Sequence, residues 1–329
     1  LRRTTPTPSL GPYVVTEYVP NERVVAEANP EFLGEPPAIR RVVVHKISRE
    51  DLPRAFLTGE VDITVPNAVT LAQAREVQAT RRDAVHIRPS AAFVFLAPDL
   101  DHPLLGRLEI RRALLMAIDR ARLAETVYGD AGRIAELPVP ELWPPGAVHT
   151  AYDPDASREA LAEAGVIGAT LKVVHQDDAM GMQILAEVRR DLEAVGIATE
   201  SVVVPSTFRV AREGRWDGLL SHVLRANRDA PPGRFWNLPF ENGEYVYSHR
   251  SDAFTDEVFA LVERERHALY PERREQLRDA LLALTTERLP NLPLVFAAER
   301  ILADPSLQGW DHGSTTVFGS WLHTWHFAP

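Results

Sequence analysis

The segment from Thr170 to Val223 constrains the fold of this chain more than any other part of the sequence. Its apolar residues alternate between the spacing of strands and the spacing of helices. The predicted order is strand 170–175, helix 180–195, strand 197–204, helix 206–213 and strand 216–223. A helix is the usual crossover between parallel neighbouring strands. The segment therefore predicts the parallel, doubly wound sheet of an α/β protein.

The rest of the chain predicts a mixed α/β architecture around that segment. Before it we expect a hairpin over 13–28, strands over 39–47, 61–65, 84–88 and 91–96, and helices over 49–58, 70–79, 108–127 and 156–164. After it we expect helices over 252–268 and 271–284 and strands over 292–297 and 300–303. Four prolines between 135 and 152 predict an irregular stretch. A chain of 329 residues suggests about two domains.

Charge and composition argue against several classes of protein. The chain has 36 basic and 46 acidic residues, a formal net charge of −10, which disfavours binding to nucleic acid or to an anionic membrane surface. No apolar run approaches the ~20 residues of a membrane span. Because the sequence contains no cysteine, disulfides, thiolate metal sites and a cysteine nucleophile are excluded.

The usual signatures of catalysis are missing from the sequence. We find no phosphate-binding loop, no Gly-x-Ser-x-Gly turn and no His-Glu-x-x-His helix. Asp153 and Asp155 flank a proline and suit a helix start better than acid–base catalysis. His323 and His326, with His312 upstream, lack a convincing further ligand for a metal. We therefore predict neither an enzyme nor a bound metal or cofactor.

Five short phrases carry a resemblance to a known family. In order they are Gly-Pro-Tyr at 11–13 with 21–25 and 28–30, Thr-Gly-Glu-Val-Asp-Ile at 58–63, Ile-Arg-Arg-Ala-Leu at 110–114 with 117–120, Tyr-Asp-Pro-Asp at 152–155 with 160–165, and Arg-Trp-Asp at 215–217. Each phrase has a local reason, such as a helix cap or a closing glycine, and none implies chemistry. Together, over residues 9 to about 310, the chain resembles the family-5 extracellular solute-binding proteins of ABC importers, which include oligopeptide-, dipeptide- and nickel-binding proteins.

The resemblance implies a two-lobe, periplasmic-binding-protein-like α/β fold of type II, cluster C-like, in which a hinge motion encloses the ligand. Mapped here, residues 1–8 form an extended tail, 9–92 with 298–329 form lobe I, and 93–297 form lobe II. Members of the family carry a further segment before the Gly-Pro-Tyr phrase. The resemblance therefore implies that the N-terminal part of lobe I is missing here, through truncation, through a separate chain that supplies it, or in a minimal variant.

The implied function is reversible binding of a peptide or similar small organic solute in a cleft between the lobes, for delivery to a membrane permease. The implied location is periplasmic or extracellular. The chain opens Leu1-Arg2-Arg3 without the apolar core of a signal peptide, which we interpret as a mature or truncated form. Two alternatives stay open: a ligand-sensing regulatory module, and a degenerate scaffold for interactions.

The resemblance also indicates where the ligand would bind. Peptide-binding relatives carry an Asp in a Gly-Trp-x-Ala-Asp phrase, but the stretch 221–227 here reads Ser-His-Val-Leu-Arg-Ala-Asn, and Asp229 is offset. Arg225 and Arg228 could instead hold a carboxylate or phosphate, or they could be solvated loop arginines.

Aromatic residues and one histidine complete the expected site. Phe93, Phe95, Phe235 and Trp236 are candidate walls, with core packing as the alternative. His175 follows a strand where ligand loops occur in α/β proteins, with a capped helix start at Asp177 or Asp178 as the alternative. The expected ligand-binding set is Phe93, Phe95, His175, Arg225, Asn227, Arg228, Asp229, Phe235 and Trp236.

Overall fold

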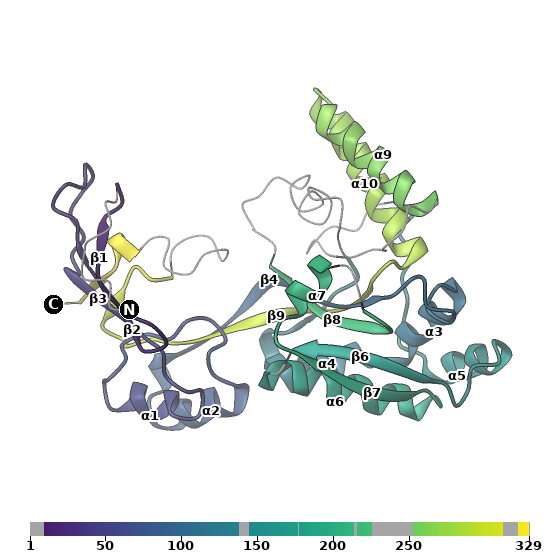
Figure 1. Cartoon of the computed structure of the whole chain (residues 1–329), viewed down its shortest axis with the longest axis horizontal. Helices are drawn as coiled ribbons and strands as arrows, with labels where there is room; N and C mark the ends of the chain where they lie inside the picture. The colour runs from purple at the N-terminus through teal and green to yellow at the C-terminus, as the bar shows by residue number, and fades with distance from the viewer. Residues whose placement is uncertain are drawn as a thin grey trace. The chain divides into compact units, whose positions relative to one another are not determined.

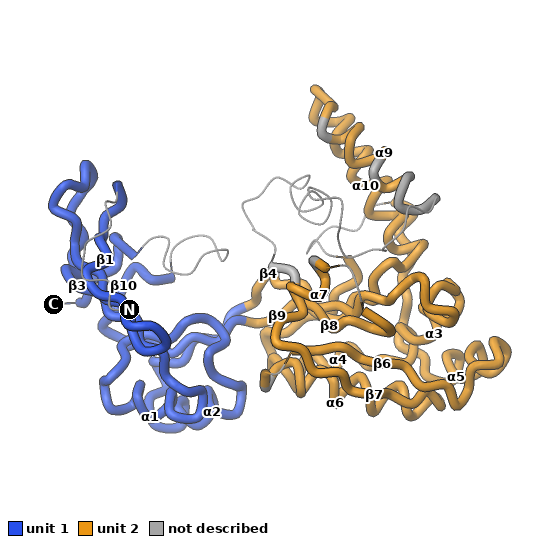
Figure 2. Tube along the Cα trace, in the orientation of Figure 1, with its two compact units in different colours: residues 1–88, 299–329 blue, residues 89–298 orange. Residues whose placement is uncertain are grey.

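The computed structural model describes residues 10–137, 145–176, 178–213, 216–225, 253–311 and 322–328. The chain divides into two compact units (Figure 2): unit 1 comprises residues 1–88 and 299–329, and unit 2 comprises residues 89–298. The divisions predicted from the sequence lie at 92/93 and 297/298. Whether the units act as ligand-binding lobes stays a prediction.

Unit 1 begins with a three-stranded antiparallel sheet in the order β1 (Tyr13–Val19), β2 (Arg23–Ala28), β3 (Arg41–His45). The first two strands form the predicted hairpin, and Asn21 adopts a positive φ of 62° in its turn, a conformation that Asn tolerates well. A bulge between Val15 and Glu17 shifts the register of the pair.

The helical part of unit 1 packs around a small apolar core. It contains α1 (Leu52–Leu57), α2 (Leu71–Thr80) and η1 (Arg82–Ala84). Thr70 and Gln73 cap α2 reciprocally. Phe56, Val77 and Leu302 are among the residues of the core. The short elements β10 (Leu307–Gln308), η3 (Leu322–Thr324) and β11 (His326–Phe327) complete the unit.

The prediction of a strand over 61–65 was wrong. Only one bridge forms there, between Ile63 and Ala303. The Thr64 side chain accepts a hydrogen bond from the Leu302 N–H at 3.0 Å, and Asn67 turns the chain with a φ of 61°. Backbone hydrogen bonds from the Thr64 N–H to the Leu302 carbonyl and from the Asp304 N–H to the Asp62 carbonyl flank this bridge, and the left-handed Asn67 turns the chain before the pairing extends into a strand.

Unit 2 is built on a mixed six-stranded sheet (Figure 1). Its order is β5 (Arg133–Ile134), β9 (Leu292–Leu302), β4 (Val85–Pro98), β8 (Leu219–Arg225), β6 (Thr170–Gln176), β7 (Ala198–Val204). Strand β6 pairs in parallel with both β7 and β8, which confirms the doubly wound prediction. Strand β4 runs antiparallel to β8.

Helices cover both faces of this sheet. They are α3 (Leu108–Ala117), α4 (Arg120–Tyr128), η2 (Gly129–Ala131), α5 (Pro154–Glu163), α6 (Ala179–Ala194), α7 (Thr207–Glu213), α9 (Ala253–His267) and α10 (Pro271–Arg288). Side chains of α7, α9 and α10 share a buried cluster with one face of the sheet, including Phe95, Leu220 and Phe296. Helices α4 and α6 lie on the other side (Figure 1), and α6 packs on β6 and β7.

The single helix predicted over 108–127 is two helices. Ile118 has extended backbone after α3, and the Asp119 carboxylate accepts a hydrogen bond from the Arg122 N–H at 3.0 Å at the start of α4. A capping Asp therefore starts a new helix inside a continuous apolar periodicity.

The strands that link the units are also longer than expected. β4 and β9 each run unbroken where the sequence predicted two strands, because each continues from one unit into the other.

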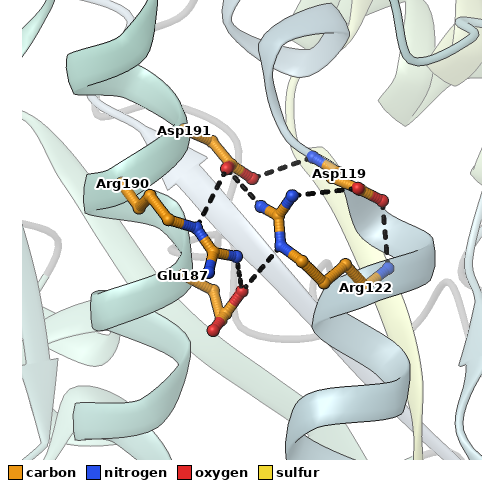
Figure 3. Close-up of polar contacts among 5 residues, drawn as sticks. All are labelled: Asp119, Arg122, Glu187, Arg190 and Asp191. Carbon is orange, nitrogen blue, oxygen red and sulfur yellow. Dashed lines mark hydrogen bonds and ion pairs between the residues drawn. The ribbon is translucent and has the colours of Figure 1, made fainter.

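A network of five charged side chains joins α4 to α6 (Figure 3). Arg122 lies 3.1 Å from Glu187 and 3.0 Å from Asp119, and it also pairs with Asp191. Arg190 pairs with Glu187 and lies 3.7 Å from Asp191. Burial raises the pKa of both Glu187 and Asp191 above the usual range. Arg122 opposes this effect at both carboxyls, and at Asp191 a hydrogen bond from the Asp119 N–H does so as well.

Candidate ligand-binding site

The carboxyl ends of β6, β7 and β8 meet at one edge of the sheet in unit 2, at Gln176, Val204 and Arg225. In open α/β sheets, ligands bind at the edge where parallel strands end. Strand β4 reaches the same edge, since Ala92 pairs with Arg225. We take this edge as the candidate site.

His175 lies at this edge but in the interior. Its side chain has no exposed surface. The Nε2 atom lies 2.7 Å from Ser201 Oγ, and Nδ1 lies 3.0 Å from the Gln176 carbonyl oxygen. Both ring nitrogens thus have protein partners, and the imidazole orients β6 against β7.

The chain after His175 forms a capped helix start, the alternative that the sequence left open. The Asp178 carboxylate accepts a hydrogen bond from the Gly181 N–H at 2.7 Å and another from the Gln176 side chain at 3.2 Å. Asp177 lies outside the described residues. The carboxylate at this position therefore satisfies the first turn of α6.

Phe93 and Phe95 belong to the core cluster on the other face of the sheet. Both are buried, and their rings stack with centroids 4.9 Å apart. Residues at alternate positions of a strand share a face: Val174 joins this cluster, whereas its neighbour His175 points to the opposite face. His175 and Phe95 therefore lie on opposite faces of the sheet, and their part in ligand binding stays a prediction.

A second histidine, His222, was not among the expected site residues. It pairs with Phe95 across the ladder, and the two rings meet edge to face at 5.6 Å. Its Nδ1 lies 3.2 Å from Thr207 Oγ1. Burial lowers the pKa of His222 to about 4, so the imidazole is neutral near pH 7. The sequence did contain a signal for the position of His222: the alternation of side chains along β8 places it with Leu220 on the core face.

The remaining expected residues lie at or beyond the end of β8. The backbone of Arg225 closes the strand opposite Ala92. Asn227, Arg228, Asp229, Phe235 and Trp236 lie outside the described residues, so their role stays a prediction.

No cluster of three metal-ligating side chains occurs among the described residues. His323 lies in η3, and its ring centroid is 6.4 Å from that of Phe32. His326 lies in β11, and its Nδ1 is 3.3 Å from the Thr324 carbonyl oxygen. His312 lies outside the described residues. Within the part of the chain that is described, no helix is long and apolar enough to span a bilayer.

Comparison with solved structures shows the fold. NikA from Brucella suis, in complex with Fe(III)-EDTA, superimposes with a TM-score of 0.82 at 19% identity, over 97% of this chain and 68% of that one. The oligopeptide-binding protein AppA from Bacillus subtilis, in complex with a nonapeptide, gives a TM-score of 0.78 at 14% identity, over 97% and 66%. These matches confirm the predicted periplasmic-binding-protein-like α/β fold.

Sequence relatives lead to the same group of proteins. The chain is 21% identical to the peptide transport periplasmic protein SapA of Haemophilus influenzae over 327 residues, which covers 94% of this chain and 56% of the relative. It is 28% identical to the probable ABC transporter periplasmic-binding protein SapA of Escherichia coli, over 61% of this chain and 38% of the relative. The chain thus spans about half or less of the length of these relatives.

The family comparison covers most of the chain. The family described as bacterial extracellular solute-binding proteins, family 5, middle region, matches residues 2–243. That match includes the phrases on which the predicted resemblance rested. The chain therefore belongs to the family-5 bacterial extracellular solute-binding proteins.

Proposed function

We propose that this chain acts in an ABC importer as a solute-binding protein, which captures a peptide or similar small organic solute and delivers it to a membrane permease. Membership of family 5 carries the proposal. The relatives' names, which include peptide transport and periplasmic binding, support both the class of solute and a location outside the cytoplasmic membrane. The comparisons lend no support to a separate chain that supplies part of the fold, and the proposal contains none.

The chemistry of the candidate edge supports binding rather than catalysis. Among the described side chains there, His175 has both nitrogens engaged and Asp178 caps a helix. A catalytic acid or base must reach the reacting group of a substrate, and neither of these two residues is available to do so. Reversible capture needs only apolar surface and a few oriented polar groups.

In this proposal the residues at and after the end of β8 contact the solute. They are Arg225, Asn227, Arg228, Asp229, Phe235 and Trp236. Phe93, Phe95 and His175 support this edge from the interior, through the packing and hydrogen bonds described above. An arginine fork would suit a carboxylate of the solute, and Trp236 would supply apolar surface.

A thermal-shift experiment on the full chain tests the proposal with defined probes: Met-Leu, tri-alanine, a nonapeptide, Ni(II)-histidine and citrate. A ligand at 100 times its Kd stabilises the folded state by about 2.7 kcal/mol, so at least one probe should raise Tm by several degrees. Trp236→Ala should abolish most of that shift. Arg209→Ala is the control, since Arg209 is exposed and pairs with Glu213 within α7. The proposal fails if no probe raises Tm, or if Trp236→Ala responds like Arg209→Ala.

A further inference from the structure

Unit 1 contains an open cavity of about 700 Å³ that is separate from the edge described above. It lies between the start of β4 and the segment that holds β10 and β11, and its polar and aromatic lining consists of His86, Arg88, Gln308, Trp310, Asp311 and His326. This volume falls within the range of small-molecule sites in proteins. All of these residues belong to unit 1.

One indole ring organises the lining. His86 and Arg88 are two positions apart on β4 and so project from the same face of the strand. Trp310 contacts both: its ring centroid is 4.7 Å from that of His86, and the Arg88 guanidinium carbon lies 5.9 Å from it. The cavity therefore presents a cation beside two aromatic rings.

A buried carboxylate fixes the direction of that cation. Glu299 is 96% buried and pairs with Arg88, its Oε2 lying 3.2 Å from Nε. Within the described part of the chain, this contact engages the inner nitrogen of the guanidinium and leaves its two terminal nitrogens for another acceptor. Two terminal N–H groups in one plane match the two oxygens of a carboxylate.

The neighbouring His86 does not add a second positive charge to the cavity. Burial lowers the pKa of His86 below its ordinary value, Arg88 lowers it further and Asp311 opposes both effects. Near pH 7 the imidazole thus serves mainly as aromatic surface. Among the described residues, two charged side chains line the cavity, the cation Arg88 and the carboxylate of Asp311, so an incoming anion binds at Arg88 and on the side away from Asp311.

We propose that this cavity is a second small-molecule site, in which Arg88 binds the carboxylate of a flat, ring-bearing organic acid and Trp310 with His86 contacts its ring. The site does not depend on the proposed function, because its residues lie in unit 1 and the β8 edge lies in unit 2. It would accept small aromatic carboxylates and would discriminate against both their neutral amides and anions without a ring.

Isothermal titration calorimetry on the full chain tests this with benzoate, benzamide and acetate. For so small a ligand we expect benzoate to bind with Kd on the order of 1 mM, and the other two to bind at least about tenfold more weakly. Arg88→Ala should reduce benzoate affinity by a similar factor. Arg81→Ala is the matched control, because Arg81 also lies in unit 1, 3.2 Å from a carboxylate and 5.5 Å from a phenyl ring, but outside the cavity.

A further variant covers the case in which Arg88→Ala unfolds the chain by leaving Glu299 unpaired. Trp310→Leu keeps that ion pair and should also weaken benzoate binding severalfold. The saturation-transfer NMR signal of benzoate should be reduced in both variants and unchanged in Arg81→Ala. Equal binding of benzoate and benzamide, or wild-type affinity in Trp310→Leu, would overturn the proposal.

Discussion

Buried arginines give a structural role to two of the short segments that carry the family resemblance. In Ile-Arg-Arg-Ala-Leu, Arg111 donates to the carbonyl oxygens of Leu105, Arg288 and Leu289 at 2.8, 2.6 and 2.9 Å. It thereby satisfies the end of α10, where the last carbonyls lack helical partners. In Ala-Ile-Asp-Arg, Arg120 donates to the Ala135 and Thr150 carbonyl oxygens and to Glu136. Both phrases therefore serve the architecture of unit 2.

Replacing Arg111 tests this at the scale of one residue. Arg111→Ala should lower the free energy of unfolding by about 3 kcal/mol, because it leaves three carbonyls without their charged donor. The adjacent Arg112 is only half-buried and donates to the Glu287 carbonyl oxygen at 3.1 Å. Arg112→Ala should therefore cost less than about 1 kcal/mol. Urea unfolding measures both variants, and equal losses would contradict the assigned role.

His222 gives a prediction about pH. Its folded pKa of about 4 lies below the ordinary 6.5, so the folded state takes up a proton less readily than the unfolded chain. Its contribution to stability is complete above pH 6.5 and is lost as pH falls toward 4. We expect it to cost about 2–3 kcal/mol between pH 7.5 and 4.5. His222→Gln should show a shallower decline in urea unfolding over that range, and a ring NMR signal titrating near pH 6.5 would refute the prediction.

At the scale of elements, the junction of α4 and α6 depends on a shared cation. Arg122→Met should lower the free energy of unfolding by about 3 kcal/mol at pH 7.5, since the buried Glu187 and Asp191 would lose the α4 cation that they share and keep only Arg190. The loss should shrink at pH 5, because protonation neutralises carboxyls whose pKa burial already raises. Urea unfolding at the two pH values measures the difference.

A neutralised variant separates the charge effect from packing. Adding Glu187→Gln and Asp191→Asn to Arg122→Met removes the uncompensated charges. It should recover at least half of the lost stability and abolish the difference between the two pH values. If the triple variant is no more stable than Arg122→Met, the helices are held by apolar packing instead.

The elements were predictable where apolar periodicity and caps agree. The alternation between 170 and 223 predicted the order and the parallel pairing of β6, β7 and β8. Apolar periodicity failed where a side chain overrides it, as at Asp119, whose cap divides one periodic stretch into α3 and α4. The same pattern predicted two strands where β4 is one, because Pro89 locally indicates the end of a strand. In the structure, pairing with β8 and β9, which are distant in sequence, continues β4 through Pro89.

The residues of the candidate site were harder to predict, because the sequence does not show which of them are buried. From sequence, Phe93 and Phe95 suit a ligand wall and a core equally well. Their register opposite Leu224 and His222 decides for the core face, and that register depends on contacts more than 100 positions away. His175 likewise follows a strand as a ligand residue would, yet its partner Ser201 on β7 holds it inside.

At the scale of the whole molecule, the two units differ in how their sheets are covered. In β1, β2 and β3 only Val25 is buried, and Val15, Tyr18 and Val44 are among the exposed large apolar residues. The ladder places Val15 with Ala26, and Tyr18 with Val24 and Val44, on one uncharged face. In β9, by contrast, every residue is buried.

This difference predicts unequal local stability, because opening free energy follows the apolar contacts that a segment makes. Backbone amides of β1 and β2 should exchange with deuterium about 100-fold faster, after correction for intrinsic rates, than those of β6 and the unit 2 part of β9. That ratio corresponds to roughly 3 kcal/mol of opening free energy.

Hydrogen-exchange mass spectrometry of the full chain resolves the segments. The α2 peptide is an internal reference, since α2 belongs to unit 1 but packs its own core through Ala74 and Val77. Slower exchange in β1 and β2 than in α2 would mean that the apolar face is covered in solution, and an equal rate across all segments would mean that the units unfold as one.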